Sequence, residues 1–118
     1  MTDGADAGAR AEWFERAHAA NAPPQAPELP ESWAAALAEL RAAYCAGAWA
    51  ATIVLAFSLA EAAQRRHLTD DPEFEWLRER RNRVAHLGED YPDSATLESD
   101  ARGAVRAALR CAYASLFR

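Results

Sequence analysis

A stretch of 19 residues without a charged side chain, residues 42–60, constrains the fold of this chain more than any other feature. Eight of these residues are alanine, and Tyr44, Gly47 and Thr52 interrupt the larger hydrophobic side chains. The length would suffice for a membrane span, but alanine contributes little to insertion, and spans are usually richer in Leu, Ile, Phe and Val. A helix that is buried on most sides within a bundle or a dimer gives the same pattern. We therefore expect a buried helical region without a membrane span, and the amount of apolar surface predicts a homodimer.

The composition favours helices over strands. Hydrophobic residues make up 51% of the chain, but many are alanine, and there are only one isoleucine and three valines. No Asn-Gly or Asp-Gly pair suggests a β-hairpin. At 118 residues the chain has room for one hydrophobic core. We expect an all-α fold, a small bundle of about four to five helices.

The chain divides into an N-terminal arm and a helical domain. Four prolines near the end of the arm deny its backbone the hydrogen bonds that a helix needs. Residues 1–30 are therefore expected to form a flexible arm, with at most a short helix at 11–20. That helix would show Trp13 and Phe14 on one side, either to dock onto the domain or to contact a partner chain. Residues 31–118 are expected to form the helical domain.

Hydrophobic spacing predicts the first two helices of this domain. The first helix carries an apolar stripe, with residues three and four positions apart, from Trp33 to Tyr44. Gly47 marks a bend or the start of a second helix. We expect that second helix to run from Trp49 to about His67.

Capping residues predict the two helices that follow. The third helix is expected to begin near Pro72, to run through Leu87 and to end at Gly88 in a left-handed C-terminal cap. The residues able to cap its N-terminus have short, oxygen-bearing side chains and are Thr69, Asp70 and Asp71. Asp93 or Ser94 is expected to cap the last helix in the same way.

Charge and cysteine content limit the function classes. The formal net charge of −5 argues against a protein that coats nucleic acid non-specifically, although it allows a local basic patch. All 13 positive side chains are arginine, which codon bias in GC-rich coding sequence largely explains. Cys45 and Cys111 lie far apart and follow no metal-ligand or redox spacing, so we expect two reduced thiols. No secretory signal is visible near Met1, and we expect a cytoplasmic protein.

Reactive side chains concentrate in residues 78–86, which read Arg-Glu-Arg-Arg-Asn-Arg-Val-Ala-His. Cleavage of RNA without a metal uses the neighbouring 2′-hydroxyl as nucleophile, so it needs groups that transfer protons and a cation that offsets charge on the phosphorane. Histidine suits proton transfer because its reference pKa, about 6.5, is close to neutral pH. Arginine suits charge stabilisation because it stays protonated and fits phosphate oxygens. His86 and Arg81 can therefore supply this chemistry, with Asn82 donating to a phosphate oxygen or orienting His86.

On an ideal helix these residues do not all share one face. Arg81 and His86 are five positions apart and diverge by about 140°. Asn82 and His86 are four positions apart and share an edge with Arg78. The side chain of Arg81 must therefore bend around the helix to reach that edge. A two-fold dimer relaxes this demand, because each site can draw on both motif helices.

The order of these residues resembles the HEPN superfamily (higher eukaryotes and prokaryotes nucleotide-binding). Arg81 is followed directly by Asn82 and, after four intervening residues, by His86 near the end of a helix. The similarity extends over about residues 33–117 and includes an alanine-rich preceding helix that carries Glu61. Residues outside that range do not contribute to it.

The resemblance implies a dimerising HEPN-like bundle that cleaves RNA without a metal or cofactor, in a cleft between the protomers. The catalytic residues that it implies are Arg81, Asn82 and His86. The substrate-binding residues are Arg78 and Arg83, and a supporting residue is Glu61. In some HEPN toxins a partner antitoxin transfers a nucleotide to a tyrosine two residues after the histidine. Here that position is Gly88 and the nearest tyrosine is Tyr91, so control by this route is not expected.

Three function classes follow from these observations. The first is a metal-independent RNA endonuclease, a bacterial toxin or defence effector that acts as a homodimer and has a cognate antitoxin protein. The second is a non-catalytic HEPN-like module that binds RNA, a nucleotide or a protein. The third is a helical interaction protein, in which the arginines form a solvated face and His86 only complements the helix dipole. A further stripe, Arg102, Arg106 and Arg110, would contact an RNA backbone or form surface ion pairs.

Overall fold

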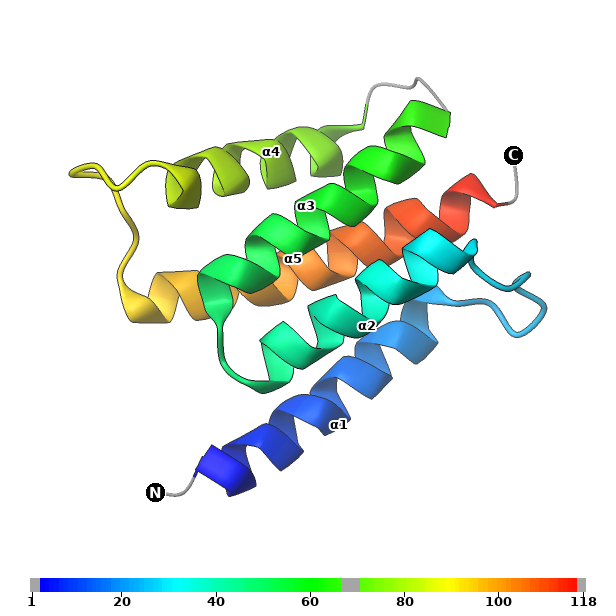
Figure 1. Cartoon of the computed structure of the whole chain (residues 1–118), viewed down its shortest axis with the longest axis horizontal. Coiled ribbons are helices and arrows are strands. Elements are labelled where there is room, and N and C mark those ends of the chain that lie inside the picture. The colour runs from blue at the N-terminus through cyan, green and yellow to red at the C-terminus, as the bar shows by residue number, and fades with distance from the viewer. Residues whose placement is uncertain (1–2, 67–70, 117–118) are drawn as a thin grey trace.

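The computed structural model describes residues 3–66 and 71–116, and within these ranges the chain forms five α-helices and no strand (Figure 1). In chain order the helices are α1 (Asp3–Asn21), α2 (Glu31–Cys45), α3 (Trp49–Arg66), α4 (Pro72–Ala85) and α5 (Ser94–Ser115). The predicted all-α class is therefore confirmed.

Helices α3 and α5 form the centre of the molecule. In Figure 1, α3 passes in front of α5, α4 lies on one side of α3 and α2 on the other, and α1 packs against α2 and α5. Helix α5 buries small side chains at Ala101, Ala104 and Ala108, each 0% exposed, and small residues let neighbouring helices approach closely. Ile53 of α3 and Leu77 of α4 are also fully buried, so the motif helix α4 shares the central core.

The charge-free stretch is not one helix. α2 ends at Cys45 and α3 begins at Trp49. Between them Gly47 has a φ of 74°, a left-handed conformation that glycine adopts without strain, and its N–H donates to the Tyr44 carbonyl at 2.9 Å. Gly47 therefore lies in the turn between two helices, and the second helix begins two residues later, at Trp49. Among the described residues no helix is both long enough and apolar enough to cross a membrane.

The N-terminal segment differs from the expected flexible arm. α1 spans 19 residues instead of 11–20 alone, and it packs against the domain. Phe14 is only 2% exposed, and Trp13 stacks on Tyr44 with ring centroids 4.8 Å apart. Docking of the two aromatic residues was thus the correct interpretation, whereas the flexible arm was wrong. Alanine has the highest helix propensity, so the alanines before position 11 extend the helix, and the prolines act only after its end.

The boundaries of α4 agree with the sequence at its start and differ at its end. The Asp71 carboxylate accepts from the Glu73 N–H at 2.9 Å and caps α4 as predicted; the alternative caps Thr69 and Asp70, and His67 at the expected end of α3, lie outside the described residues. The helix stops at Ala85 and not at Leu87. His86 is extended, with φ −120° and ψ 114°, and Gly88 does not adopt the predicted left-handed cap.

Two backbone hydrogen bonds explain this earlier end. The Gly88 N–H donates to the His86 carbonyl at 2.9 Å, and the Tyr91 N–H donates to the Gly88 carbonyl at 3.1 Å. The chain therefore turns immediately after α4. Asp93 then caps α5 by accepting from the Thr96 N–H at 2.8 Å, which confirms one of the two predicted caps.

Asp71 also ties the start of α4 to α5. Its carboxylate accepts from Arg110 Nη2 at 3.0 and 2.9 Å, and Arg110 Nε donates to Glu73 at 2.8 Å. Partial burial opposes ionisation of Asp71, but the hydrogen bonds from Arg110 and from the Glu73 N–H outweigh it and hold the pKa of this carboxyl below its ordinary value. The stabilisation from this contact is therefore fully present above the unfolded-state pKa, about 3.9, and is lost as the pH falls through the folded-state pKa.

We expect Asp71→Asn to lower the free energy of unfolding at neutral pH by about 1 kcal/mol, because it removes the charge that faces Arg110 but keeps a capping side chain. Asp71→Ala should cost about 1 kcal/mol more, because the N-cap is lost as well. Urea denaturation at about pH 7 and about pH 3 measures both effects, and the difference between Asp71→Asn and the wild type should shrink at the lower pH. Equal stability of the two proteins at neutral pH would contradict the assignment.

Candidate active site

Arg78 and Arg83, the two predicted substrate-binding arginines, already have carboxylate partners on α4. Arg78 Nη1 donates to Glu75 at 3.3 Å, and its guanidinium lies 5.1 Å from the centre of the Phe74 ring. Arg83 lies 3.6 Å from a Glu79 oxygen. Pairs of this kind at a protein surface contribute little to stability, so either arginine can exchange its partner for a phosphate at small cost.

Arg80 faces the body of the protein and has a structural role. Its guanidinium lies 5.0 Å from the centre of the Trp76 ring, and its Nε is 3.5 Å from the Asp100 carboxylate of α5. A Cβ added to Gly103 would come within 2.7 Å of the Trp76 ring, so the absent side chain at Gly103 makes room for this tryptophan. These contacts fix the rotation of α4 about its axis and so determine which arginines face outward.

Arg81 is held differently from the other arginines of α4. Its guanidinium carbon lies 4.3 Å from the centre of the Phe57 ring of α3, and Phe57 is in turn stacked on Phe74 with centroids 5.4 Å apart. The Arg81 Nε is buried and has no hydrogen-bond acceptor, and within residues 3–66 and 71–116 no carboxylate lies in ion-pair range of Arg81. An aromatic face stabilises a cation without neutralising it. Arg81 therefore presents, at the junction of α3 and α4, a positive charge that no described carboxylate compensates.

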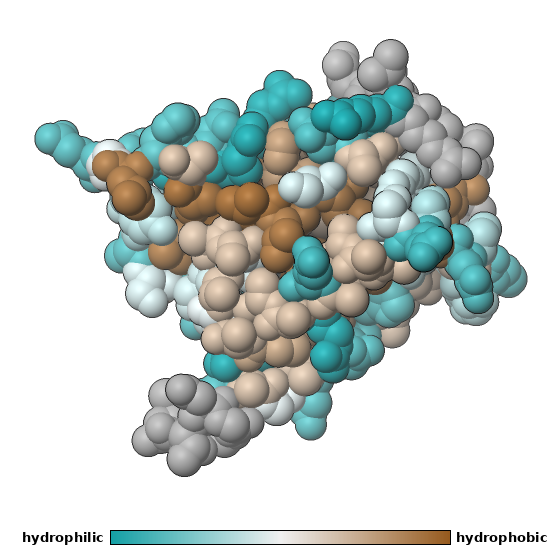
Figure 2. Space-filling view, in the orientation of Figure 1, coloured by the Kyte–Doolittle hydropathy of each residue, from teal (hydrophilic) through white to brown (hydrophobic). Residues whose placement is uncertain are grey.

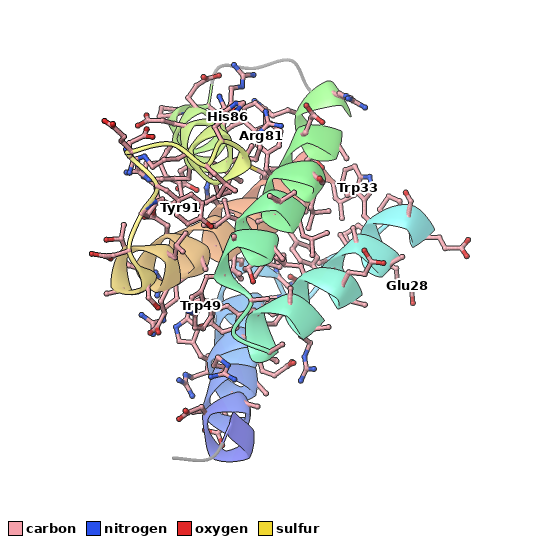
Figure 3. All side chains as sticks on the ribbon, turned by 60° about the vertical axis from the view of Figure 1, so that its left-hand side comes forward. Glu28, Trp33, Trp49, Arg81, His86 and Tyr91 are labelled. Carbon is pink, nitrogen blue, oxygen red and sulfur yellow. The ribbon has the colours of Figure 1, made fainter. Side chains whose placement is uncertain are left out.

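His86 lies just past the end of α4 and is exposed. Figure 3 shows Arg81 between α4 and α3, with His86 next to it in projection. Because the helix ends at Ala85, the divergence of 140° that an ideal helix would impose does not apply to His86. Its neighbour Leu87 is 87% exposed, which is unusual for a large hydrophobic side chain. The imidazole is accessible to a substrate or to a second protein chain.

Asn82 and Glu61 do not contact Arg81 or His86 among the described residues. Asn82 is exposed, and in the part of the chain that the structure describes its amide makes no hydrogen bond to His86. Glu61 pairs with Arg65 on its own helix at 3.4 Å, and its side chain is 42% exposed. Within the described part of one chain Glu61 therefore pairs with Arg65 and not with Arg81 or His86, and its supporting role stays a prediction that needs another chain or the substrate.

Phe57 is the residue that sequence reasoning missed. It is 5% exposed and lies in a helix of hydrophobic residues, where its spacing is typical of a core position. Nothing local indicates that its ring supports the Arg81 guanidinium, because the two residues belong to different helices. Only the packing of α3 against α4 brings them together.

The described residues offer neither a metal cluster nor a reactive thiol near Arg81 and His86. No group of three or more His, Cys, Asp or Glu side chains in these ranges could hold a metal ion. Cys45 and Cys111 are free thiols. Burial, followed by the negative charge of Asp71, raises the pKa of Cys111 to about 12, so this thiol is protonated at neutral pH.

The site thus consists of an exposed histidine, an arginine that lies on an aromatic ring without a described carboxylate partner, and two weakly paired arginines on the same helix. Chemically, these side chains are able to bind a phosphate and to transfer a proton. Comparison with known proteins returns no matching protein family, curated protein or solved structure.

Proposed function

We propose that this protein is a metal-independent RNA endonuclease that acts as a homodimer, in the manner of a bacterial cytoplasmic toxin or defence effector with a cognate antitoxin. The observation that carries the proposal is the state of Arg81. Its cation is fixed by Phe57, lacks a carboxylate partner among the described residues and is followed in the sequence by the exposed His86. The Nε of Arg81 is itself buried, so a phosphate would be bound through the terminal nitrogens of the guanidinium.

Each residue has a role in the proposed reaction. Arg81 binds the non-bridging oxygens of the scissile phosphate and offsets the charge that develops on the phosphorane. His86 takes the proton of the 2′-hydroxyl or protonates the leaving 5′-oxygen. The 2′-oxygen forms a bond to phosphorus and the 5′-oxygen leaves, which gives a 2′,3′-cyclic phosphate and a 5′-hydroxyl. Arg78 and Arg83 would contact phosphates on either side.

Among the residues that the structure describes, one chain supplies one histidine at this site, whereas the reaction uses both a base and an acid. A second copy would provide the other histidine if the two motif helices met across a two-fold axis. Helix α3 offers a surface for such contact, because Ala51, Val54 and Ser58 are exposed and, at spacings of three and four residues, share one face. Figure 2 shows apolar surface across α2 and α3, directly beside α4. This face supports a dimer that includes the motif.

We expect Val54→Asp to convert the dimer into a monomer, because it places a charge in the middle of the exposed α3 face. Light scattering at micromolar concentration should give twice the chain mass of 12.9 kDa for the wild type and 12.9 kDa for the variant. Ala95→Asp, which adds the same charge at an exposed position of α5, is the matched control and should stay dimeric. A wild type that is monomeric at this concentration contradicts the proposed assembly.

The reaction itself is tested on purified protein and labelled RNA in the presence of EDTA. We expect cleavage to persist, since Arg81 and His86 need no metal, and the products should end in 2′,3′-cyclic phosphate. A substrate with 2′-deoxyribose at the cut site should not be cleaved, because its nucleophile is missing. Activity that EDTA abolishes and magnesium restores would disprove the mechanism. Binding of RNA without any cleavage would favour the non-catalytic alternative.

A further inference from the structure

Two further arginines contact aromatic side chains at the junction of α1, α2, α3 and α5. Tyr44 is at its centre, 4.8 Å from Trp13 and 5.4 Å from Trp49 between ring centroids. The guanidinium of Arg10 lies 5.8 Å from the Trp49 ring, and Arg102 Nε donates to the Tyr44 hydroxyl at 3.3 Å. Alternation of arginine with aromatic rings is a pattern that suits single-stranded nucleic acid.

A surface pocket of about 320 Å³ opens between these residues. Its lining consists of one indole, two arginines, two carboxylates and an alanine, namely Asp6, Ala9, Arg10, Trp49, Glu98 and Arg102. The volume is at the lower end of the range for small-ligand sites, which suits a base with part of its sugar. The lining is therefore mostly charged and includes one aromatic ring.

Arg10 is fixed in a position to act on a ligand. Its Nε donates to the Cys45 carbonyl at the end of α2, at 2.7 Å. Within the described ranges its two terminal nitrogens have no acceptor, and no carboxylate is in ion-pair range of the guanidinium. By contrast, Arg102 is paired with Glu98, and Arg110 with Asp71. The stripe on α5 is thus largely occupied by surface ion pairs, whereas Arg10 is a cation of the pocket that pairs with none of the described carboxylates.

We propose that this pocket binds one nucleotide unit of single-stranded RNA, away from the point of cleavage. The base stacks on the planar Trp49 and Arg10 groups, and the terminal nitrogens of Arg10 bind the phosphate. Asp6 and Glu98 repel phosphate, so they face the base and accept hydrogen bonds from its amino groups. This orientation favours bases that carry an amino group over uracil.

The position of the pocket is compatible with one strand reaching both sites. Figure 1 places the carboxyl end of α4 and the amino end of α3 on the same side of the molecule. Figure 3 brings that side forward and shows His86, Tyr91 and Trp49 along it. The choice of RNA as the source of the nucleotide rests on the proposed function, whereas the chemistry of the pocket would also suit a free nucleotide.

The test measures binding by the His86→Ala protein, so that its outcome does not depend on cleavage. A fluorescently labelled RNA oligonucleotide of about ten residues and unlabelled AMP, CMP and UMP are titrated against this protein. Further variants are Arg10→Gln, Trp49→Leu and Trp49→Phe, all in the same background. Arg16→Ala is the matched control, because it removes one exposed arginine from the same helix as Arg10. Circular dichroism checks that each variant is folded.

We expect Arg10→Gln and Trp49→Leu to weaken oligonucleotide binding on the order of tenfold, with Trp49→Phe intermediate and Arg16→Ala unchanged. Arg10→Gln should also reduce the slope of log Kd against log salt by about 0.7, the value for one single-strand phosphate contact. If AMP and CMP bind in a manner that depends on Arg10 and UMP does not, the pocket takes a free nucleotide as well. If Arg10→Gln and Trp49→Leu, both folded, bind RNA and nucleotides as the background protein does, or if nothing binds, the proposal is overturned.

Discussion

His86→Ala is expected to lower the rate of RNA cleavage by a factor on the order of 10²–10⁴, the usual loss when a general acid or base is removed. Folding should be unaffected, because the imidazole lies beyond the end of α4 and makes no hydrogen bond among the described residues. Binding of RNA should weaken little, since the histidine supplies proton transfer and not the main phosphate contact. The measurement is the single-turnover rate on a labelled RNA, together with thermal unfolding and an RNA titration.

The matched control for this variant is Leu87→Ala. Leu87 adjoins the histidine and is 87% exposed, so its truncation changes the same segment without removing a titratable group. We expect its cleavage rate to stay within severalfold of the wild type. If His86→Ala cleaves as fast as Leu87→Ala, the histidine takes no part in the chemistry. If His86→Ala does not fold, its role is structural and the site assignment is wrong.

The helical class and the starts of α4 and α5 could be predicted because they depend on local interactions. Asp71 and Asp93 each accept a hydrogen bond from an N–H two or three residues later, which the sequence alone makes visible. The end of α4 could not be predicted in this way. Gly88 is compatible both with a left-handed cap and with a tight turn, and the choice depends on where the chain must go to start α5.

The sequence proposes the residues of the candidate site but does not predict their electrostatics. The spacing of Glu75 to Arg78 and of Glu79 to Arg83 is that of helical ion pairs, so those partners could have been expected from the sequence. The state of Arg81 could not, because it depends on Phe57 of another helix. The motif therefore proposes the arginine, and tertiary packing places it on Phe57, where no described carboxylate pairs with it.

The extent of α1 could not be predicted from local sequence either. Its amphipathic signal is weak, since the buried side is formed by few large residues, of which Phe14 and Trp13 are the main ones. Its stability comes from packing against α2 and α5 more than from its own propensity. A role for this segment in a pocket with Trp49 could only appear once α1 was placed beside the start of α3.

Arg81→Met should separate function from stability more sharply than any other substitution in this chain. Methionine can maintain contact with Phe57, while it removes the cation and the buried Nε that lacks an acceptor. We expect the free energy of unfolding to stay equal or to rise by up to about 1 kcal/mol, since an unsatisfied buried group is removed. Cleavage should fall by a factor on the order of 10²–10³, the typical loss when a group that stabilises the transition-state charge is removed. RNA binding should weaken as well, because a phosphate contact is lost.

Two further variants show that the loss comes from the charge and its geometry. Arg81→Lys should recover only part of the cleavage rate, because an ammonium is a point charge and cannot bind two phosphate oxygens side by side. Arg41→Ala removes an exposed arginine that pairs with Glu15, far along the chain from the motif, and should cleave as the wild type does. Urea denaturation and single-turnover cleavage of all the variants give the two quantities. If Arg81 served only to hold α4 on α3, the result would be different. Arg81→Met would then lower the free energy of unfolding and the cleavage rate together. Stabilising the protein with an osmolyte would restore both quantities.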